Sequence, residues 1–474
     1  MILGVDLGTS SVKVALVEPD GTPLATASRA YPLDTPRPGW AEQDPERWWD
    51  ATCDAVHEAT RSAGRTDVAA IGLSGQMHTL VLLDANDRAV RPALSWADGR
   101  SAAVLEDLSR RVPHERQVAV LGNRFVAGFT GPSLAWIRTY EPGSYAATRR
   151  VCLAKDALRL RMTGEWATDA SDASATCLFH VAERRWSHEV IEALDLDPSL
   201  LPPVRDSAEV AGRLRLAAAR ELGLPADVPV ATGAGDQAAA ATGCGLVDPG
   251  ATLATLGSGG QVFAPLDRPV PDPELRVHLF CHARPDRWHL QGAVQNVGLA
   301  LDWARRALRC SWSEFVALAG AAPAGADGVT FVPYLTGERT PRMDPSARGA
   351  WTELSLAHGP EALARAALEG TTFAVADAVH AVGAVGAEVR TLAVTGGGAE
   401  LDLTRRILAD ATGARIERAE VRDASVRGAT VLAGATAPRF ASEPEATDPS
   451  DADEHRAAYA RYRRTAGTDA AITS

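Results

Sequence analysis

The opening stretch, residues 1–17, constrains the fold of this chain more than any other part of its sequence. The apolar run Ile2 to Val5 predicts a buried strand, and Val12 to Val17 alternate as expected of its hairpin partner. A short polar turn joins the two runs. The sequence therefore predicts a strand–turn–strand unit in which the turn carries the functional groups.

This turn offers the groups that a phosphate and its metal ion need. Gly8 lets the backbone approach a ligand closely, and the N–H groups and hydroxyls of Thr9 and Ser10 are donors for phosphate oxygens. Asp6, at the strand end, could hold Mg²⁺ directly or through water, and Lys13 could reach a phosphate as a point charge. An ordinary hairpin with a polar turn is the alternative interpretation.

The chain has 474 residues, which predicts two or more domains, and its 46% hydrophobic and 23% charged residues are ordinary for a globular protein. Its net charge of −12 argues against nucleic acid or an anionic membrane as the main partner, although a local cluster could still bind an anionic substrate. We see no apolar run long enough to cross a bilayer and no charged-then-apolar leader. We therefore expect a cytoplasmic protein.

Cysteine and lysine usage narrows the chemistry further. The six cysteines are scattered without a C-x-x-C pair, so we expect buried reduced thiols and neither a metal site nor a disulfide framework. The basic residues are almost all arginine, which a genome bias largely explains. Lys13 and Lys155 are the lysines, and a site role for either one stays open.

Two polar stretches suit a sugar or polyol. A helix is predicted from Asp44 and Pro45 to about Ala59. The strand Val68 to Leu73 that follows opens into the polar pentad 74–78 before a second apolar run begins, so its side chains can face a cleft. The pentad ends in His78, which alone would more often be a structural histidine.

Trp96, Asp98 and Arg100 supply an aromatic plane, a carboxylate and a guanidinium within a short stretch, which suits a polyol or sugar. A core tryptophan beside a turn explains the same residues equally well.

Asp236 is the candidate general base. The strand Val228 to Thr232 runs into small residues, and an Ala-rich helix starts at Ala238, so the carboxylate sits at a strand end with room for a substrate. Asp is equally suited to capping that helix, which is the alternative.

The opening pattern returns after a linker at 246–250. Ala251 to Leu256 read as a strand, and a Gly/Ser turn at 257–260 leads into a second strand, which indicates a duplicated architecture. Two such turns facing each other across a cleft would grip a polyphosphate. Near the end, the strand Leu392 to Thr395 meets three glycines that would let the backbone lie flat against a nucleoside.

Taken in order, these pieces resemble the FGGY family of carbohydrate kinases, and within it the xylulose kinases most closely. The resemblance covers roughly residues 1 to 440. Each motif is modest alone, and their shared order is specific. The motifs are Asp6 to Lys13, Gly39 to Pro45, Gly72 to His78, Trp96 to Arg100, Ser171 to Ser174, Gly233 to Gln237, Tyr334 to Pro341 and Gly396 to Ala399.

The resemblance implies an α/β fold of two actin-like ATPase domains with ribonuclease-H-like cores and an active-site cleft between them. Residues 1–245 would carry the sugar site, the catalytic aspartate and the first phosphate turn. Residues 246–440 would carry the second phosphate turn and the adenosine site, and 441–474 would form a polar C-terminal tail. The polar composition after Ala441 predicts a short helix in this tail, followed by disorder.

The resemblance also implies ATP with Mg²⁺, Asp236 as the catalytic base and Asp6 as the carboxylate on the Mg²⁺ side. The implied sugar-binding residues are Met77, His78, Trp96, Asp98, Asp236 and Gln237. The implied nucleotide-binding residues are Gly8, Thr9, Ser10, Lys13, Gly257, Ser258, Gly259, Gly396, Gly397 and Gly398.

We therefore expect transfer of the γ-phosphoryl group of ATP to the terminal hydroxyl of a ketopentose, D-xylulose giving D-xylulose 5-phosphate. Gln237 and Ala97 depart from the residues common in xylulose kinases, so another ketose or a polyol stays an alternative, and an actin-like ATPase scaffold is a more distant one. The expected partners are the sugar and ATP, without nucleic acid or membrane. The oligomeric state is open, with a homodimer as one alternative.

Overall fold

The computed structural model describes residues 1–419, 422–440, 446–450 and 453–469, and the chain divides into two compact units. The division expected from the sequence, at 245/246, lies close to the observed one after Val247. Two later segments also belong to unit 1, which the sequence did not predict. Unit 1 comprises Met1–Val247, Phe280–Trp288 and Arg422–Phe440, and unit 2 comprises Asp248–Leu279, His289–Val421 and Ala441–Ser474.

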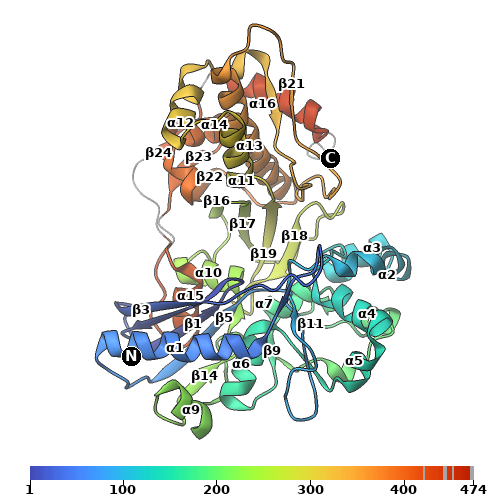
Figure 1. Ribbon diagram of the computed structural model, residues 1–474, viewed down its shortest axis with the longest axis vertical. Coiled ribbons are helices and arrows are strands. Elements are labelled where there is room, and N and C mark those ends of the chain that lie inside the picture. The colour runs from blue at the N-terminus through green and yellow to red at the C-terminus, as the bar shows by residue number, and fades with distance from the viewer. Residues whose placement is uncertain (420–421, 441–445, 451–452, 470–474) are drawn as a thin grey trace. The chain divides into compact units, whose positions relative to one another are not determined.

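The centre of unit 1 is a mixed sheet with the strand order β13-β14-β5-β1-β2-β3, in which β15 also pairs with β5 (Figure 1). β1 pairs antiparallel with β2, which confirms the predicted opening hairpin, and it pairs parallel with β5. The strands are β1 (Ile2–Leu7), β2 (Ser11–Val17), β3 (Pro23–Ala30), β5 (Ala70–Gly75), β13 (Val210–Arg213), β14 (Pro229–Ala231) and β15 (Ala234–Gly235).

Helices and short strand pairs surround this sheet. The helices are α1 (Pro45–Ala63), α2 (Leu105–Arg111), α3 (His114–Arg116), α4 (Thr130–Tyr140), α5 (Pro142–Ala147), α6 (Ala154–Thr163), α7 (Ala170–Ala173), α8 (His188–Ala193), α9 (Leu216–Leu222), α10 (Asp236–Cys244) and α15 (Ala424–Leu432). The short strands are β4 (Glu42–Gln43), β6 (Val81–Leu83), β7 (Ala93–Leu94), β8 (Arg150–Cys152), β9 (Thr168–Asp169), β10 (Phe179–His180), β11 (Arg185–Trp186) and β12 (Val204–Arg205).

Helix α1 starts where the sequence predicts. The Asp44 carboxylate accepts a hydrogen bond from the backbone N–H of Glu46 at 3.0 Å, and Pro45 is the first helical residue, where its missing N–H costs nothing. The helix runs past the predicted end near Ala59 and stops at Gly64, which has φ of 66°.

The two faces of the sheet are covered by helices from opposite ends of the chain. Successive side chains of a strand point to opposite faces, and Leu3, Val5 and Leu7 of β1 pack in one hydrophobic cluster with Trp48 of α1. Gly4 faces the other way, where a Cβ would lie 2.5 Å from the carbonyl oxygen of Val426 in α15. Helix α15 therefore covers the face opposite α1.

Close backbone contact holds α15 in place. A Cβ added at Gly72 of β5 would lie 1.8 Å from the carbonyl oxygen of Ala429, and one at Gly428 would lie 1.8 Å from that of Ala239 in α10. No side chain fits at either position. The glycines thus allow α15 to lie directly on the sheet and on α10.

Unit 2 repeats the central motif of unit 1. Its sheet has the order β18-β19-β17-β16-β22-β23-β24, and β16 pairs antiparallel with β17 and parallel with β22, as β1 does with β2 and β5. The strands are β16 (Thr252–Leu256), β17 (Gly260–Leu266), β18 (His278–Cys281), β19 (Trp288–Val294), β22 (Thr391–Thr395), β23 (Arg415–Arg418) and β24 (Ala446–Thr447), with β20 (Thr330–Val332) and β21 (Ala350–Thr352) as a separate pair. The helices are α11 (Gly298–Ala307), α12 (Trp312–Ala321), α13 (Pro360–Ala384), α14 (Asp402–Thr412) and α16 (Asp453–Ala466).

The segment after residue 440 is more than the polar tail that the sequence led us to expect. The short helix predicted there is α16, and its Tyr459 and Tyr462 side chains are buried in unit 2. The Tyr459 hydroxyl donates to the Asp377 carboxylate of α13 at 2.6 Å. One aromatic face is enough to anchor a helix whose average composition is polar. The predicted disorder at the very end, 470–474, falls outside the described residues, as do 441–445 and 451–452.

All six cysteines are free, and Cys152, Cys177, Cys244 and Cys281 are buried, as the sequence predicts, whereas Cys53 and Cys310 are partly exposed. In the described part of the chain, no helix combines the length and apolar character that crossing a membrane requires.

Candidate active site

Three parallel strands of unit 1 end side by side at the predicted site. Leu7 at the end of β1 pairs with Gly75 of β5, and Gly75 pairs with Gly235 of β15. The next residues along the three strands are Gly8, Gln76 and Asp236. Ligands of open α/β sheets bind outside the carboxyl ends of their strands, so this edge is where a substrate is expected.

Asp236 is the first residue of α10, and Gly235 occupies the capping position that the sequence left as an alternative for Asp236. Burial raises the pKa of the Asp236 carboxyl to about 7, and the nearby Asp6 carboxylate adds to the rise, whereas hydrogen bonds with Gln237 oppose it. A carboxylate with a pKa near neutral is a suitable general base. Gln237, predicted from the sequence to bind the sugar, contacts the Asp236 carboxylate.

Asp6 lies at the end of β1, opposite Lys13 of β2 and Ser74 of β5. The Ser74 hydroxyl donates to its Oδ1 at 2.9 Å. Burial raises the pKa of Asp6, and the Ser74 hydrogen bond and the Lys13 charge oppose this rise. Asp6 and Asp236 thus place two mutually repelling carboxylates at the same edge of the sheet.

This pair fits a Mg²⁺ ion carried by a nucleotide. Within the described ranges, no group of three or more His, Cys, Asp or Glu side chains is arranged to hold a metal alone. Mg²⁺ commonly binds through one or two carboxylates, with phosphate oxygens and waters completing its shell. A divalent cation at Asp6 would also relieve the repulsion that raises the pKa of Asp236.

The first phosphate turn is held from its carbonyl side. The Tyr31 hydroxyl donates to the carbonyl oxygen of Gly8 at 2.6 Å, and the Gln43 side-chain amide donates to that of Thr9 at 2.7 Å. The backbone N–H of Tyr31 donates to the carbonyl oxygen of Ser10 at 3.1 Å. The Gly8 N–H donates to the carbonyl oxygen of Ser11 at 3.0 Å, which leaves the N–H groups of Thr9 and Ser10 and the hydroxyl of the exposed Ser10 to face an anion.

Lys13 points its ammonium group at Asp423, just before α15, with a distance of 2.7 Å from Nζ to Oδ1. Both side chains are about two-fifths exposed. A phosphate would have to compete with Asp423 for Lys13, which the sequence did not predict.

Met77 packs beside Asp236, and His78 follows it in the chain. Met77 is buried, and a Cβ on Gly235 would lie 2.9 Å from its Cγ, so Met77 packs directly on the residue before Asp236. His78 has φ of 68°, a conformation that costs a non-glycine residue energy and that often marks functional sites. Its ring stacks on Phe129 with centroids 3.8 Å apart, and its Nδ1 lies 2.6 Å from the carbonyl oxygen of Ala175.

Trp96 and Asp98, two residues apart in the sequence, have different environments. The Trp96 side chain is 39% exposed, and its Nε1 donates to the Thr9 hydroxyl at 2.8 Å. Asp98 is buried, and its oxygens accept from the backbone N–H of Ala41 at 2.6 Å and from the guanidinium of Arg100 at 2.8 Å. Because these bonds occupy both oxygens, the geometry argues against the predicted sugar contact through Asp98, which fixes the loop carrying Trp96.

The second phosphate turn and the three glycines lie at adjacent strand ends of unit 2. Thr255 of β16 pairs with Thr395 of β22, so the turn at 257–259 and the glycines at 396–398 follow neighbouring strands. Gly396 has φ of 94°, and a Cβ there would lie 2.6 Å from the carbonyl oxygen of Leu256. The nucleotide-binding residues predicted in this half of the sequence are therefore close together.

Comparison with known proteins decides the family. A family model described as the N-terminal domain of the FGGY family of carbohydrate kinases matches residues 1–243, and its C-terminal counterpart matches residues 252–437. The chain belongs to the FGGY family of carbohydrate kinases. This agrees with the resemblance seen in the sequence.

Relatives of this FGGY kinase are named xylulose kinases. One from Escherichia coli (strain K12) is 42% identical over 88% of this chain and 86% of that protein. One from Bacillus subtilis (strain 168) is 33% identical over 91% of this chain and 87% of that protein. A crystal structure described as a "xyloylose kinase" from Brucella ovis has a TM-score of 0.92, 35% identity and 99% coverage of both chains.

Below the site, the kinase contains a buried charge network that the sequence did not predict. The Lys155 ammonium lies 2.8 Å from a carboxylate oxygen of Asp156 and 3.0 Å from those of Asp169 and Asp172, all fully buried. Burial would lower the pKa of Lys155, but the three carboxylates outweigh it and raise this pKa. Burial likewise raises the pKa of Asp172 to about 8.

This network reaches the strand that carries the base. Asp169 accepts a hydrogen bond from the Ser171 hydroxyl, which in turn accepts one from the backbone N–H of Gly235 at 3.1 Å. Lys155 is thus linked to the residue before Asp236 without reaching the reacting groups. Neither Lys155 nor Ser171 carries a local pattern that would have revealed this, since the partners come from distant segments.

Glu338 and Arg339, whose roles the sequence left open, belong to unit 2. One Glu338 oxygen accepts from the backbone N–H groups of Gln295 at 2.7 Å and Arg339 at 2.8 Å. Burial raises the pKa of Glu338 to about 7, and these two hydrogen bonds oppose the rise. Glu338 therefore ties two loops together through backbone contacts.

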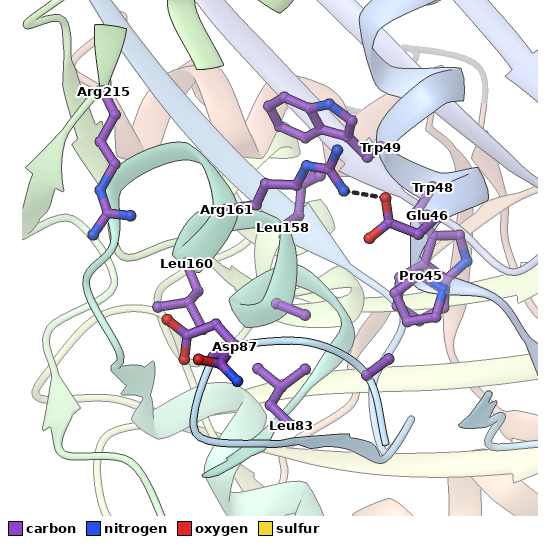
Figure 2. A pocket seen from close by; sticks show the side chains of 13 residues that line it. Pro45, Glu46, Trp48, Trp49, Leu83, Asp87, Leu158, Leu160, Arg161 and Arg215 are labelled. Atoms are coloured by element: carbon purple, nitrogen blue, oxygen red, sulfur yellow. Dashed lines mark hydrogen bonds and ion pairs between the residues drawn. The ribbon is translucent and has the colours of Figure 1, made fainter. Parts of the chain in front are cut away.

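A cavity of about 290 Å³ in unit 1 is lined by none of the predicted site residues (Figure 2). The Arg161 guanidinium crosses it to pair with Glu46 and lies 4.6 Å above the Trp49 ring. Of its other charged side chains, Asp87 pairs with Arg150 and Arg215 donates to the carbonyl oxygen of Thr163, and we assign the cavity no ligand.

Proposed function

We propose that this FGGY kinase transfers the γ-phosphoryl group of ATP to the terminal hydroxyl of D-xylulose, giving D-xylulose 5-phosphate and ADP. The observation that carries the chemistry is the Asp236 carboxyl, whose pKa of about 7 suits it to accept a hydroxyl proton at neutral pH. The observation that carries the substrate is the naming of its relatives as xylulose kinases.

In this proposal, unit 1 performs the chemistry. Met77, His78 and Trp96 hold the sugar beside Asp236, which accepts the proton of the attacking hydroxyl. The backbone N–H groups of Thr9 and Ser10 receive the phosphoryl oxygens. Asp6, together with the phosphates, would hold a bound Mg²⁺ ion, which would neutralise charge that develops during phosphoryl transfer.

Unit 2 holds the nucleotide in this proposal. The turn at 257–259 contacts the phosphates through backbone N–H groups, and the glycines at 396–398 pack against the adenosine. Backbone groups suffice for this role, because the adenosine end of the nucleotide is bound and released without any chemical change. We place the enzyme in the cytoplasm, because its free cysteines suit a reducing compartment and its proposed substrate ATP is available there.

The two departures from the xylulose kinase pattern lie at the proposed sugar site, because Gln237 contacts the Asp236 carboxylate and Ala97 adjoins Trp96. We would measure ADP formation by the purified protein with Mg-ATP, without sugar and with D-xylulose, D-ribulose, L-ribulose, D-fructose or glycerol. A large, saturable rise with D-xylulose is expected. A larger rise with another compound would keep the kinase and change its substrate, whereas ATP turnover that no sugar affects would favour the scaffold interpretation.

A further inference from the structure

Two sets of groups from the sugar side of unit 1 converge on one residue of the first phosphate turn. Trp96, a proposed sugar contact, donates from Nε1 to the Thr9 hydroxyl at 2.8 Å. Thr9 also accepts, at its backbone carbonyl oxygen, a hydrogen bond from the Gln43 side chain at 2.7 Å. Thr9 is therefore held by both its side chain and its backbone.

The Gln43 side chain is hydrogen-bonded to the segment that carries Met77 and His78, the proposed sugar contacts. The Gln76 side-chain amide donates to Gln43 Oε1 at 2.8 Å, and Gln76 directly precedes Met77. Both glutamines are 1% exposed. Because Gln43 accepts at its oxygen and donates at its nitrogen, a flip of its amide would break both bonds, and the burial of both side chains keeps bulk solvent from replacing them.

The two connections differ in mobility. The Gln76–Gln43 pair is buried and fixes the carbonyl of Thr9, whereas the Trp96 ring is 39% exposed and free to respond to a ligand against it. A sugar that packs on the Trp96 ring would restrict the ring and so strengthen its bond to the Thr9 hydroxyl. The N–H of Thr9 belongs to the turn that receives the phosphoryl oxygens.

We infer that Thr9 couples occupancy of the sugar site to the shape of the first phosphate turn, with Trp96, Gln43 and Gln76 as positioning residues. The inference rests on the proposed function and adds to it. A bound sugar improves nucleotide binding, and a bound nucleotide improves sugar binding by the same factor, as linkage requires. Gln43 thereby gains a function although it touches neither ligand.

The test measures this coupling factor by binding, so it does not depend on turnover. The affinity for Mg-AMP-PNP, a non-hydrolysable ATP analogue, is measured by titration calorimetry without and with saturating D-xylulose. Trp96→Phe keeps an aromatic plane and removes the indole N–H, and Thr9→Val keeps the shape and removes the hydroxyl. One neutral hydrogen bond contributes about 0.5–1.5 kcal/mol, so each change should reduce the coupling factor by about two- to twelve-fold.

A double-mutant cycle distinguishes a shared bond from two separate effects. If the Trp96–Thr9 bond carries the coupling, the double variant loses no more than either single variant. Gln43→Met should lower the coupling factor in the same direction through the carbonyl of Thr9. Trp166→Phe is the matched control, because it removes an indole donor to the carbonyl oxygen of Val151 at 3.0 Å elsewhere in unit 1, and it should leave the coupling unchanged.

The outcomes separate this inference from the proposed function. If the wild type phosphorylates D-xylulose and Trp96→Phe retains full coupling, or if the two single losses add up, the coupling through Thr9 is wrong and the function stands. If D-xylulose neither changes analogue affinity nor is phosphorylated, the proposed function fails and the inference fails with it. A loss of coupling in Trp166→Phe as well would show a general loss of order in unit 1 and would also overturn the inference.

Discussion

The two turns proposed to bind phosphate share one architecture but are stabilised in different ways. Each joins an antiparallel hairpin whose first strand has a parallel neighbour. In unit 1 the turn carbonyls are held largely by side chains, those of Tyr31 and Gln43. In unit 2 the carbonyl of Ser258 accepts from the backbone N–H groups of Val297 and Leu299, at the start of α11. The first turn thus depends on residue identity and the second on backbone geometry.

The same contrast holds for charge. Asp6 of β1 faces Lys13 and Ser74 on its neighbouring strands. The equivalent position of β16 is Thr255, which faces Gln261 and Thr395. One copy of the motif carries the carboxylate that a metal and a reacting phosphate need, while the other is neutral. In the proposed function, the duplicated motif therefore supplies two anion sites, of which only the first has a carboxylate for chemistry.

The largest expected effect is in unit 1, where side chains hold the turn and Asp236 is the proposed base. Asp236→Asn should lower kcat by about 10²- to 10⁴-fold, because the variant cannot accept the hydroxyl proton. Its unfolding free energy at pH 8 should be equal or higher, because a buried charged carboxyl is removed. Coupled ADP assays and thermal melts check both. A variant with near-normal turnover would remove Asp236 from the mechanism.

Lys155→Met should lower the unfolding free energy by about 3–5 kcal/mol, because it leaves the buried Asp169 and Asp172 carboxylates without their cation. Urea unfolding measures this change. Arg365→Met breaks a buried ion pair with Glu369 in unit 2. It is the matched control, because it removes a buried cation that has no link to Asp236. Both variants should be destabilised, and if kcat falls equally in the two, the link from Lys155 to Gly235 has no catalytic role.

The turn of unit 2 is held by backbone groups, so adding a single methyl group beside it should weaken nucleotide binding. In Gly298→Ala the new Cβ would lie 2.7 Å from the carbonyl oxygen of Gly257, and overpacking typically costs about 1–3 kcal/mol, so Mg-ATP binding should weaken by roughly five-fold or more. Gly383→Ala, where a Cβ meets open space in α13, should leave binding unchanged and stabilise the helix slightly. Calorimetric titration with Mg-ATP compares the two, and equal affinities would contradict the backbone role.

The pH dependence of kcat/KM should report the ionisation of Asp236 in unit 1. The base must be ionised to act, so kcat/KM should rise with pH and level off above about 7, and the Asp236→Asn residual activity should lack this rise. The folded pKa lies above the ordinary 3.8, so the stabilising contribution of this carboxyl is full below pH 3.8 and is lost by about pH 7. A profile that is flat between pH 5 and 8 would exclude this assignment.

The smallest effect should come from Lys13→Met. Its pair with Asp423 is well exposed, and such pairs contribute at most about 1 kcal/mol to stability. Thermal melts should hardly change, so a rise in KM for ATP would report contact with phosphate. Unchanged KM would assign Lys13 to the Asp423 pair alone.

The sequence predicted those parts of the molecule in which local pattern decides structure. The opening hairpin, the Asp44 cap and the strand leading to Gly396 each follow from apolar periodicity and turn residues that lie close together. The order of the motifs predicted the family. Sites built by neighbouring strand ends, such as Gly8 beside Gln76, follow once those strands pair.

What the sequence could not predict depends on long-range partners. Asp98 has the composition of a sugar ligand, yet Arg100 and Ala41 use its oxygens, and this becomes visible only once the loops have folded. Gln43 lies within a recognised motif, but its bond to Thr9 needs a turn far away in the chain. Lys155 looks like an isolated lysine until Asp169 and Asp172 pack around it.

The position of α15 has a consequence for how this enzyme is made. Residues 424–432 form the helix that covers the sheet of unit 1, and the strands of that sheet all end by residue 235. The central hairpin of the second sheet is encoded between these two segments. At about 5–20 residues per second, a ribosome needs roughly 9–35 s to pass from Val247 to Ala424. During that time the nascent first domain shows a bare apolar face, which makes it a client for chaperones. A gene fragment ending at residue 247 should accordingly yield insoluble protein, and supplying the missing helix in trans should restore it.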